Sequence, residues 1–409
     1  MPDPAPVGAL AELRILDLSR VLAGPSATQL LGDLGADVVK VERPGEGDDT
    51  RKWGPPFLKD AEGRDTTESS YYLSANRNKR SVTIDFTKPE GRDLVVRMAA
   101  RADVLIENFK VGTLARYGLG YDQVAELNPR LVYCSITGYG QTGPYADRPG
   151  YDFLIQGQGG LMSLTGSADG TPQRTGVAIA DLMAGMYAVV AVLAALRHRD
   201  RTGRGQHIDV ALLDTQLAWL CYSAQHYLVS GEVPPRLGNA HPNIVPYQAF
   251  PTADGHAILG IGNDRQFARF AAFVGRPDWA ADPRFTTNQA RVRHRDQLIP
   301  AIAAVMATRT TDDWVAALER EGVPCSPIKR IDQALADPQV QARGMVMALP
   351  HPLAPGPVPM VANPLRFSET PPEYRYPPPT IGEHTAEVLR DWLGVGEEEC
   401  RRLAGAGIL

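Results

Sequence analysis

Short apolar runs alternate with longer amphipathic stretches along the first third of the chain. The strand-like runs, in which apolar residues are frequent, cover residues 13–18, 37–42, 81–86, 104–108 and 131–136. The stretches with helical periodicity between them cover residues 27–34, 89–101 and 122–128. Strands that alternate with helices are typical of a mostly parallel sheet with helices on both faces. The pattern therefore predicts an α/β fold for this part of the chain.

Two long helical patterns follow, at residues 181–199 and 210–229, with a short strand at 206–209 between them. The first helix contains the longest apolar run of the sequence, residues 182–196. This run is shorter than the ~20 residues that a helix needs to cross a bilayer. We interpret it as a buried helix and expect no association with a membrane.

The composition changes near residue 231, where prolines become frequent. Strand-like runs at 245–250 and 256–261 flank a turn, and a helix is expected at 311–321 with Thr311 as its cap. Residues 350–379 are rich in proline and are expected to form an extended connection. We therefore predict a large domain that begins with residues 1–231, a smaller domain at 232–335, and a linker and C-terminal return to the large domain at 336–409.

The composition is that of a folded and mildly acidic protein. The formal net charge is -5 and the isoelectric point is near 5.9, which disfavours binding to nucleic acid. The four cysteines, Cys134, Cys221, Cys325 and Cys400, are far apart, so neither a disulfide framework nor a zinc site is expected. Residues 1–6 lack the basic and apolar regions of a signal peptide. We predict a cytoplasmic protein.

Several standard cofactor and catalytic motifs are missing from the sequence. Segments 20–25 and 157–160 both fail the GxGxxG pattern of dinucleotide-binding turns. No Walker lysine follows a glycine-rich loop, and no GxSxG or HExxH motif is present. We therefore expect no nicotinamide dehydrogenase, no serine hydrolase, no metal and no tightly bound cofactor.

A cluster of basic residues in the first part of the chain suits a phosphorylated ligand. Several of its members follow predicted strands, and open α/β sheets bind ligands at the carboxyl ends of their strands. Lys and Arg at such an edge can hold phosphate groups. The alternative interpretation is a solvated surface, which is the usual place of charged runs. The residues are Arg43, Arg51, Lys52, Arg77, Lys79, Arg80 and Arg116.

Asp181 is a carboxylate between the mostly apolar segment 176–180 and an apolar helix. One interpretation is that it caps the helix that follows. The other is a nucleophile at a helix start, where backbone N–H groups can also stabilise an oxyanion. The pattern of residues leaves both interpretations open.

Segments from about residue 10 to the C-terminal end resemble CoA-transferase family III, the formyl-CoA transferase and carnitine CoA-transferase group. They are RVLAGP at 20–25, GDLGAD at 32–37, KVERP at 40–44, NRNKRS at 76–81, ENF at 107–109, GYG at 138–140, TGRGQ at 202–206 and GEHT at 382–385. Within that family the chain is most similar to the succinyl-CoA:glutarate branch, by segments 45–51, 53–57, 134–144 and 244–250.

The resemblance implies an architecture and a set of site residues. The fold is expected to be a Rossmann-like large domain plus a smaller α+β domain, in an interlocked homodimer. Asp181 is implied to be the nucleophile, and loop 238–243 aligns with a glycine-rich loop but has far fewer glycines. The positions implied to contact CoA are Leu22, Ala23, Arg43, Asn76, Lys79, Asn108, Arg116 and Thr137.

The implied reaction moves CoA from an acyl-CoA, such as succinyl-CoA, to a short dicarboxylate such as glutarate, malate, citramalate or mesaconate. Asp181 is expected to be ionised at neutral pH and to need no general base. The second carboxylate of such an acid requires a cation or several N–H donors. Candidates by their place in the sequence are Tyr151, Arg174 and His241.

Two other functions are compatible with such a chain. An α-methylacyl-CoA racemase would use a histidine where this chain has Tyr151, and a phenol with a pKa near 10 is a poor base for an α-proton. A non-catalytic CoA-binding protein would have no need of a carboxylate at position 181. The resemblance therefore favours the transferase.

Overall fold

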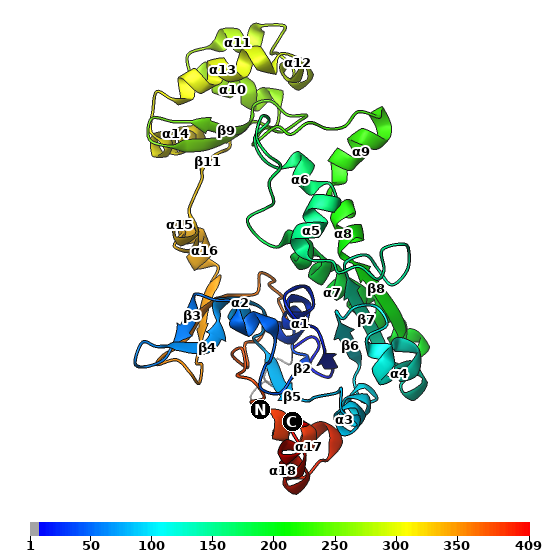
Figure 1. Cartoon of the computed structure of the whole chain (residues 1–409). Coiled ribbons are helices and arrows are strands. Elements are labelled where there is room, and N and C mark those ends of the chain that lie inside the picture. Colours follow the sequence, from blue (N-terminus) through cyan, green and yellow to red (C-terminus); the bar gives the residue numbers. More distant parts are fainter. Residues whose placement is uncertain (1–7) are drawn as a thin grey trace. The chain divides into compact units, whose positions relative to one another are not determined.

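The computed structural model describes residues 8–409, which form two compact units (Figure 1). The large unit contains the described residues up to Leu161, together with Thr175–Gln225 and Gln339–Leu409. The second unit contains Met162–Arg174 and His226–Pro338. The second unit thus includes residues 162–174, which the sequence pattern assigned to the large domain.

A six-stranded parallel sheet forms the centre of the large unit, in the order β5-β2-β1-β6-β7-β8. Counted along the chain this is the order 3-2-1-4-5-6 of a Rossmann fold, as expected from the sequence. The strands are β1 Arg14–Asp17, β2 Asp37–Glu42, β5 Lys79–Thr83, β6 Val104–Glu107, β7 Val132–Thr137 and β8 Gln206–Ala211. Strands β2 and β5 lie on one side of β1, and the later strands β6, β7 and β8 lie on its other side, so the strand order has its topological switch point between β1 and β6.

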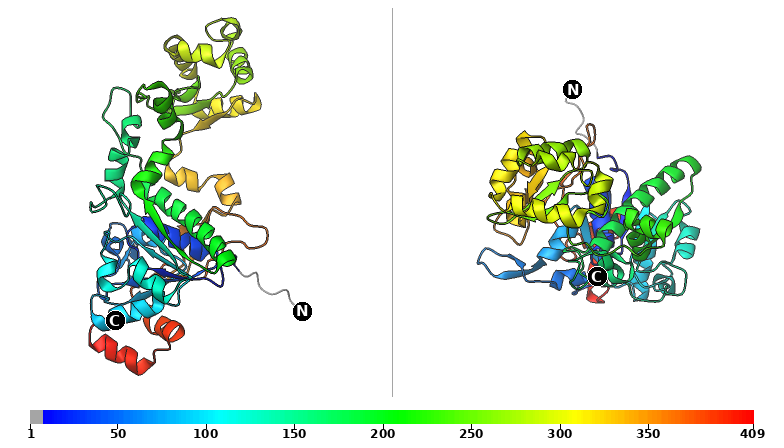
Figure 2. Two further views of the ribbon diagram at one scale, coloured as in Figure 1. Left: turned by 90° about the vertical axis from the view of Figure 1, so that its right-hand side faces the viewer. Right: turned by 90° about the horizontal axis from the view of Figure 1, so that it is seen from above.

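Both faces of the central strands β1, β6 and β7 are buried, because neighbouring apolar residues of each strand point to opposite sides. One face, with Ile15 and Val104, packs against α1 (Ala23–Asp33), α5 (Asp152–Gln158), α7 (Ile179–Thr202) and α8 (Leu212–Trp219). The other face, with Leu16 and Leu105, packs against α3 (Pro89–Ala99), α4 (Tyr121–Leu127), α17 (Thr385–Leu393) and α18 (Glu397–Gly405). The C-terminal helices therefore belong to the core of the large unit (Figure 2).

Shorter elements surround this sheet. Between β2 and β5 lie η1 (Asp49–Lys52), β3 (Phe57–Lys59), β4 (Asp65–Ser69) and α2 (Ser70–Ala75), and η2 (Leu114–Tyr117) follows β6. The expected extended connection at 350–379 includes part of an antiparallel hairpin, β12 (Val346–Leu349) with β13 (Val358–Val361). That expectation was wrong for this part of the connection.

The second unit is a small α+β domain. Its antiparallel sheet has the order β11-β10-β9, with β9 Tyr247–Pro251, β10 His256–Gly260 and β11 Cys325–Pro327. Phe250, Phe267 and Trp314 lie in its core. Its helices after β10 are α10 Asp264–Phe273, α11 Pro277–Ala281, α12 Asn288–Arg293, α13 Arg295–Met306, α14 Thr311–Arg320 and α15 Ile331–Leu335. Helix α16 (Pro338–Ala342) begins the return to the large unit.

Four expectations about helices need correction. Helix α1 begins at Ala23, not at residue 27, because Pro25 fits a first helical turn, which needs no N–H there. The helix expected at 210–229 is broken into α8 and α9 (Cys221–Ser230) at Cys221, whose φ is 45°. Thr310, not Thr311, caps α14, by accepting a hydrogen bond from the Asp313 N–H. Asp181 does not cap α7, whose N-cap is Ala178.

Helix α7 is longer and less buried than the sequence suggested. Its length and hydropathy meet the criteria for a membrane span, and 44% of its most apolar window is buried inside the structure. The buried side packs on the sheet through Ala184, Ala188 and Val192. The other side leaves an apolar stripe exposed, made of Met186, Tyr187, Val190 and Leu193.

Candidate active site

The candidate site lies at the topological switch point of the sheet, at the carboxyl ends of the neighbouring strands β1 and β6. Open α/β sheets bind their ligands at such a point. The loops after these two strands are joined by the Asn108 side chain. Its Oδ1 accepts a hydrogen bond from the Arg20 N–H at 2.9 Å, and its Nδ2 donates to the Arg20 carbonyl at 2.7 Å. These two bonds hold the loops side by side.

A cavity of about 270 Å³ opens at this point. Asp181 contributes to its wall from the first turn of α7, and Leu22 and Ala23 contribute from the start of α1. No side chain caps α1, so its first N–H groups lack a partner within the helix. The cavity is also lined by Arg20, Asp49, Asn108, Phe109, Lys110, Thr137, Arg148, Gly150, Tyr151 and Leu212.

The approach of α7 to α1 depends on Gly185, one turn after Asp181. A Cβ atom at this position would lie 2.7 Å from the Ala23 carbonyl oxygen and 2.6 Å from Ser26 Oγ. Only glycine allows the two helices to pack this closely. This contact brings the start of α1 beside the start of α7.

The Asp181 carboxyl is in an unusual electrostatic environment. Burial, followed by the negative charge of Asp152, raises its pKa to about 7. The expectation of a carboxylate that is fully ionised at neutral pH is therefore wrong for the unliganded chain, because a desolvated charge is costly. The pKa of the nearby Tyr71 is raised to about 12, chiefly by burial and further by the negative charges of Asp181 and Asp152.

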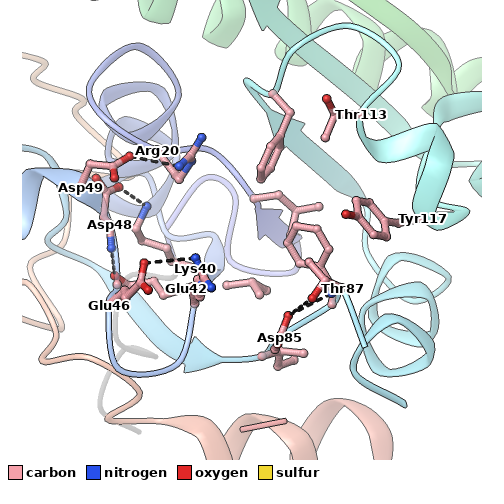
Figure 3. A pocket seen from close by; sticks show the side chains of 17 residues that line it. Arg20, Lys40, Glu42, Glu46, Asp48, Asp49, Asp85, Thr87, Thr113 and Tyr117 are labelled. Carbon is pink, nitrogen blue, oxygen red and sulfur yellow. Dashed lines mark hydrogen bonds and ion pairs between the residues drawn. The ribbon is translucent and has the colours of Figure 1, made fainter. Parts of the chain in front are cut away.

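A second and larger pocket, of about 420 Å³, adjoins the first and shares Arg20, Asp49 and Phe109 with it. Figure 3 shows charged side chains, including Arg20 and Asp49, on one side of this pocket and Thr113 and Tyr117 on the other. Arg43 also lines it. The two pockets together provide a continuous lining for a long ligand.

Aromatic rings form one wall of the larger pocket. Phe86 packs edge-on against Phe109, with ring centroids 5.8 Å apart, and against Tyr117 at 5.5 Å. The Arg20 guanidinium lies 5.1 Å from the centre of the Phe109 ring. Such a wall suits a flat heteroaromatic ring.

Four members of the basic cluster are buried and structural, and they line neither of the two pockets. Arg51, Arg77 and Arg80 are buried and form ion pairs with Glu42, Asp33 and Asp37, respectively. Lys79 is fully buried, and its Nζ contacts Asp17 at 3.2 Å, the Pro25 carbonyl at 2.9 Å and Asn76 Oδ1 at 2.9 Å. Buried charges of this kind persist because carboxylates compensate them.

Asn76 and Lys79 therefore lie behind the first turn of α1, and neither lines the two pockets. Burial lowers the pKa of Lys79 to about 8. By contrast, Arg116 lies in η2 and donates to Thr113 Oγ1 at 3.3 Å. Its neighbours Thr113 and Tyr117 line the larger pocket.

The candidates for acid recognition fall in different parts of the chain. Tyr151 lines the Asp181 cavity and is 63% exposed. Thr137 also lines it, and its Oγ1 accepts a hydrogen bond from the Gly140 N–H. Arg174 and His241 belong to the second unit, where the His241 ring packs on Tyr247 at 5.5 Å.

Sequence reasoning missed two side chains, one in the wall of the cavity and one at the first turn of α7. Arg148 lies over the Tyr145 ring, 3.8 Å from its centre, and forms no ion pair within residues 8–409. Asp152, next to Tyr151, accepts hydrogen bonds from the first turn of α7. Arg148 is one charged residue in a turn, and Asp152 is an ordinary helix-start aspartate, so nothing in the sequence pattern distinguishes either.

Comparison with known proteins decides the family, since the model of CoA-transferase family III matches residues 10–385. This chain belongs to CoA-transferase family III. It is 50% identical to a succinate–glutarate CoA-transferase of Agrobacterium fabrum, over 96% of this chain and 97% of the relative. It is 43% identical to a succinyl-CoA:glutarate CoA-transferase of Mus musculus, over 98% of this chain and 90% of the relative.

The crystal structure of a CAIB/BAIF family protein from Brucella suis has the same fold. It is 48% identical to this chain and superimposes with a TM-score of 0.84, covering 95% of this chain and all of the Brucella chain. The resemblance drawn from the motifs is thereby confirmed. A family III CoA-transferase acts on CoA thioesters and free carboxylic acids, so the chain is an enzyme.

Proposed function

We propose that this CoA-transferase moves CoA from succinyl-CoA to a short dicarboxylate such as glutarate, with Asp181 as the covalent nucleophile. The observation that carries the proposal is the position of Asp181 in a cavity at the carboxyl edge of the sheet, beside the uncapped start of α1. The relatives named above carry succinate or succinyl-CoA and glutarate in their names. Malate, citramalate and mesaconate are the alternative acceptors.

The reaction proceeds through activated aspartyl intermediates. An Asp181 oxygen attacks the thioester carbon, the C–S bond breaks, and CoA leaves as the thiolate, which gives a mixed anhydride. The thiolate then attacks the aspartyl carbonyl, releases the first acid and leaves an aspartyl-CoA thioester. The acceptor carboxylate attacks this thioester and the steps run in reverse. We assign oxyanion binding to the N–H groups of Leu22 and Ala23, each worth ~3 kcal/mol by analogy.

We place the nucleotide end of CoA in the larger pocket and its thioester end in the Asp181 cavity. The aromatic wall of the larger pocket suits the adenine ring, and Arg43 and Arg116 suit its phosphates. Asn108 and Thr137 then lie along the pantetheine arm. In this arrangement Asn76 and Lys79 do not contact CoA. They support the first turn of α1 from its buried side, because Lys79 Nζ donates to the Pro25 carbonyl and to Asn76 Oδ1.

A dicarboxylate acceptor requires a cation for its second carboxylate. Arg148 is our candidate for that role, because it lines the Asp181 cavity and has no carboxylate partner within residues 8–409. Lys110 is a second cation of the cavity wall. Tyr151, Arg174 and His241 remain sequence-based candidates for contacts with the acid.

Intact mass spectrometry after incubation with succinyl-CoA tests the nucleophile. We expect a covalent CoA adduct on the wild-type chain that hydroxylamine removes, and no adduct on Asp181→Ala. Asp147→Ala, an exposed aspartate on the loop before α5, serves as the control and should retain the adduct. An adduct that persists in Asp181→Ala would refute the proposal.

A matrix of CoA donors against C4 to C6 dicarboxylates, with chromatography of the product thioesters, tests the substrates. Glutarate should give the highest kcat/KM with succinyl-CoA as the donor. If no donor–acceptor pair gives transfer, but the α-proton of a branched acyl-CoA exchanges with deuterium, the enzyme is a racemase instead.

We also propose that the chain forms a homodimer and works in the cytoplasm. The exposed apolar stripe of Met186, Tyr187, Val190 and Leu193 on α7 supports the first point, because contiguous apolar surface of this kind marks an interface. The low net charge and the separated cysteines are consistent with the second.

A further inference from the structure

Asp152 holds the first turn of the helix that carries Asp181. Its Oδ1 accepts hydrogen bonds from the Ala180 N–H at 2.8 Å and the Asp181 N–H at 3.4 Å. The N-cap residue of α7, Ala178, has no side chain able to do this. A residue of α5 therefore supplies the cap that the local sequence of α7 lacks.

The other oxygen of Asp152 is fixed by a buried amide. Asp152 Oδ2 accepts a hydrogen bond from Gln156 Nε2 at 2.7 Å, and Gln156 is fully buried. Gln156 Oε1 in turn accepts from the Thr175 N–H at 3.0 Å. These bonds tie α5, the segment before α7 and the first turn of α7 into one rigid unit.

The Asp152 charge has no cation to neutralise it. Asp152 is 9% exposed and forms no ion pair within the described chain, 8–409. Asp152 on α5 and Tyr71 on α2 interact electrostatically with the Asp181 carboxyl. The other titratable side chains that line its cavity are Arg20, Asp49, Lys110, Arg148 and Tyr151. A buried carboxylate without a cation is costly, and it disfavours a second negative charge beside it.

We propose that Asp152 is a positioning residue for the transfer reaction, which fixes the start of α7 and places a like charge next to Asp181. The proposal rests on the proposed role of Asp181 as the nucleophile. Like charge makes Asp181 more basic, and hence a better match for the CoA thiolate, since even the thiol of cysteine has a pKa of about 8.5. Displacement of that thiolate by an ordinary carboxylate, whose acid has a pKa of about 4, has a strongly unfavourable free energy because the weaker base replaces the stronger one.

The variant Asp152→Asn removes the charge and retains an oxygen that can accept from the Ala180 N–H. Its new amide would oppose the Gln156 amide, so the double variant Asp152→Asn/Gln156→Glu is the matched control. In the double variant the new carboxylate at position 156 can again bond to both the residue at position 152 and the Thr175 N–H. The negative charge then lies on position 156, further from Asp181 than position 152. Thermal unfolding identifies any variant that fails to fold.

Two measurements test the proposal. In the first, the rate of aspartyl-CoA formation is followed against pH, where Asp152→Asn should move the acid limb to lower pH by roughly one unit and lower the plateau rate. The acid limb of the double variant should lie between those of Asp152→Asn and the wild type. An unchanged pH profile in a folded Asp152→Asn would overturn the proposal and leave Asp152 a purely structural cap.

In the second, the Asp181 carboxyl is titrated without substrate by difference infrared spectroscopy against Asp181→Asn. Its midpoint should fall in Asp152→Asn, and an unchanged midpoint would again overturn the proposal. This measurement does not depend on turnover. A wild-type enzyme that forms no adduct but shows the expected titration shift would therefore refute the nucleophile and not the electrostatic coupling.

Discussion

Asp181 combines a helix start, a cavity and a half-buried carboxyl group. Because burial raises its pKa from 3.8 to about 7, the native state binds this proton more tightly than the unfolded chain does. The contribution of the group to stability is complete below pH 3.8 and is lost as the pH rises through 7. The environment of Asp181 therefore lowers the stability of the folded chain at neutral pH.

Asp181→Asn should relieve this cost. The gain in the free energy of unfolding over wild type is expected to grow between pH 4 and pH 7 and then to level off. Its upper limit is on the order of 4 kcal/mol, at ~1.4 kcal/mol for each pKa unit. Urea unfolding at pH 5 and pH 8 measures it, and a difference that does not change with pH would contradict the assigned environment.

Arg148 is the residue that should decide between dicarboxylates and monocarboxylates. Arg148→Met removes a charge-assisted bond worth ~1.5–3 kcal/mol, so kcat/KM for glutarate should fall ~10- to 100-fold. Kinetics with butyrate as the acceptor are the internal control and should change little. Equal losses for both acids would show that Arg148 serves CoA or the fold instead.

At the scale of elements, the packing of α1 on α7 creates the site. Gly185→Ala would place a methyl group within 2.7 Å of the Ala23 carbonyl oxygen. We expect a loss of ~1–3 kcal/mol in stability and a fall in kcat, since Asp181 would move away from the start of α1. Gly356→Ala, on the loop between β12 and β13 with nothing within 4 Å, is the control and should leave both quantities unchanged.

Several elements also show where periodicity is a reliable guide. Five of the six sheet strands were predicted close to their observed bounds, because short runs with frequent Val, Ile or Leu that alternate with helical patterns indicate the strands of a parallel sheet. The break between α8 and α9 was missed, since Cys221 carries no glycine or proline signal for its φ of 45°.

At the scale of the whole molecule, the exposed stripe on α7 predicts self-association. Val190, which is 61% exposed at the centre of the stripe, becomes a buried charge in a dimer when changed to Asp. Val190→Asp should therefore shift the protein towards monomers at micromolar concentration, as measured by light scattering. Leu127→Asp, which alters an exposed leucine on α4, should leave the oligomeric state unchanged.

The sequence by itself determined the α/β class, the family and the position of Asp181, because strand periodicity and contiguous motifs are local properties of the chain. Only the tertiary structure showed that Lys79 and Asn76 lie behind α1, that Arg148 joins Asp181 in one cavity, and that Asp152 caps α7. Burial and through-space contact arise between segments far apart in sequence. They set the charge state of Asp181, which no pattern of neighbouring residues could reveal.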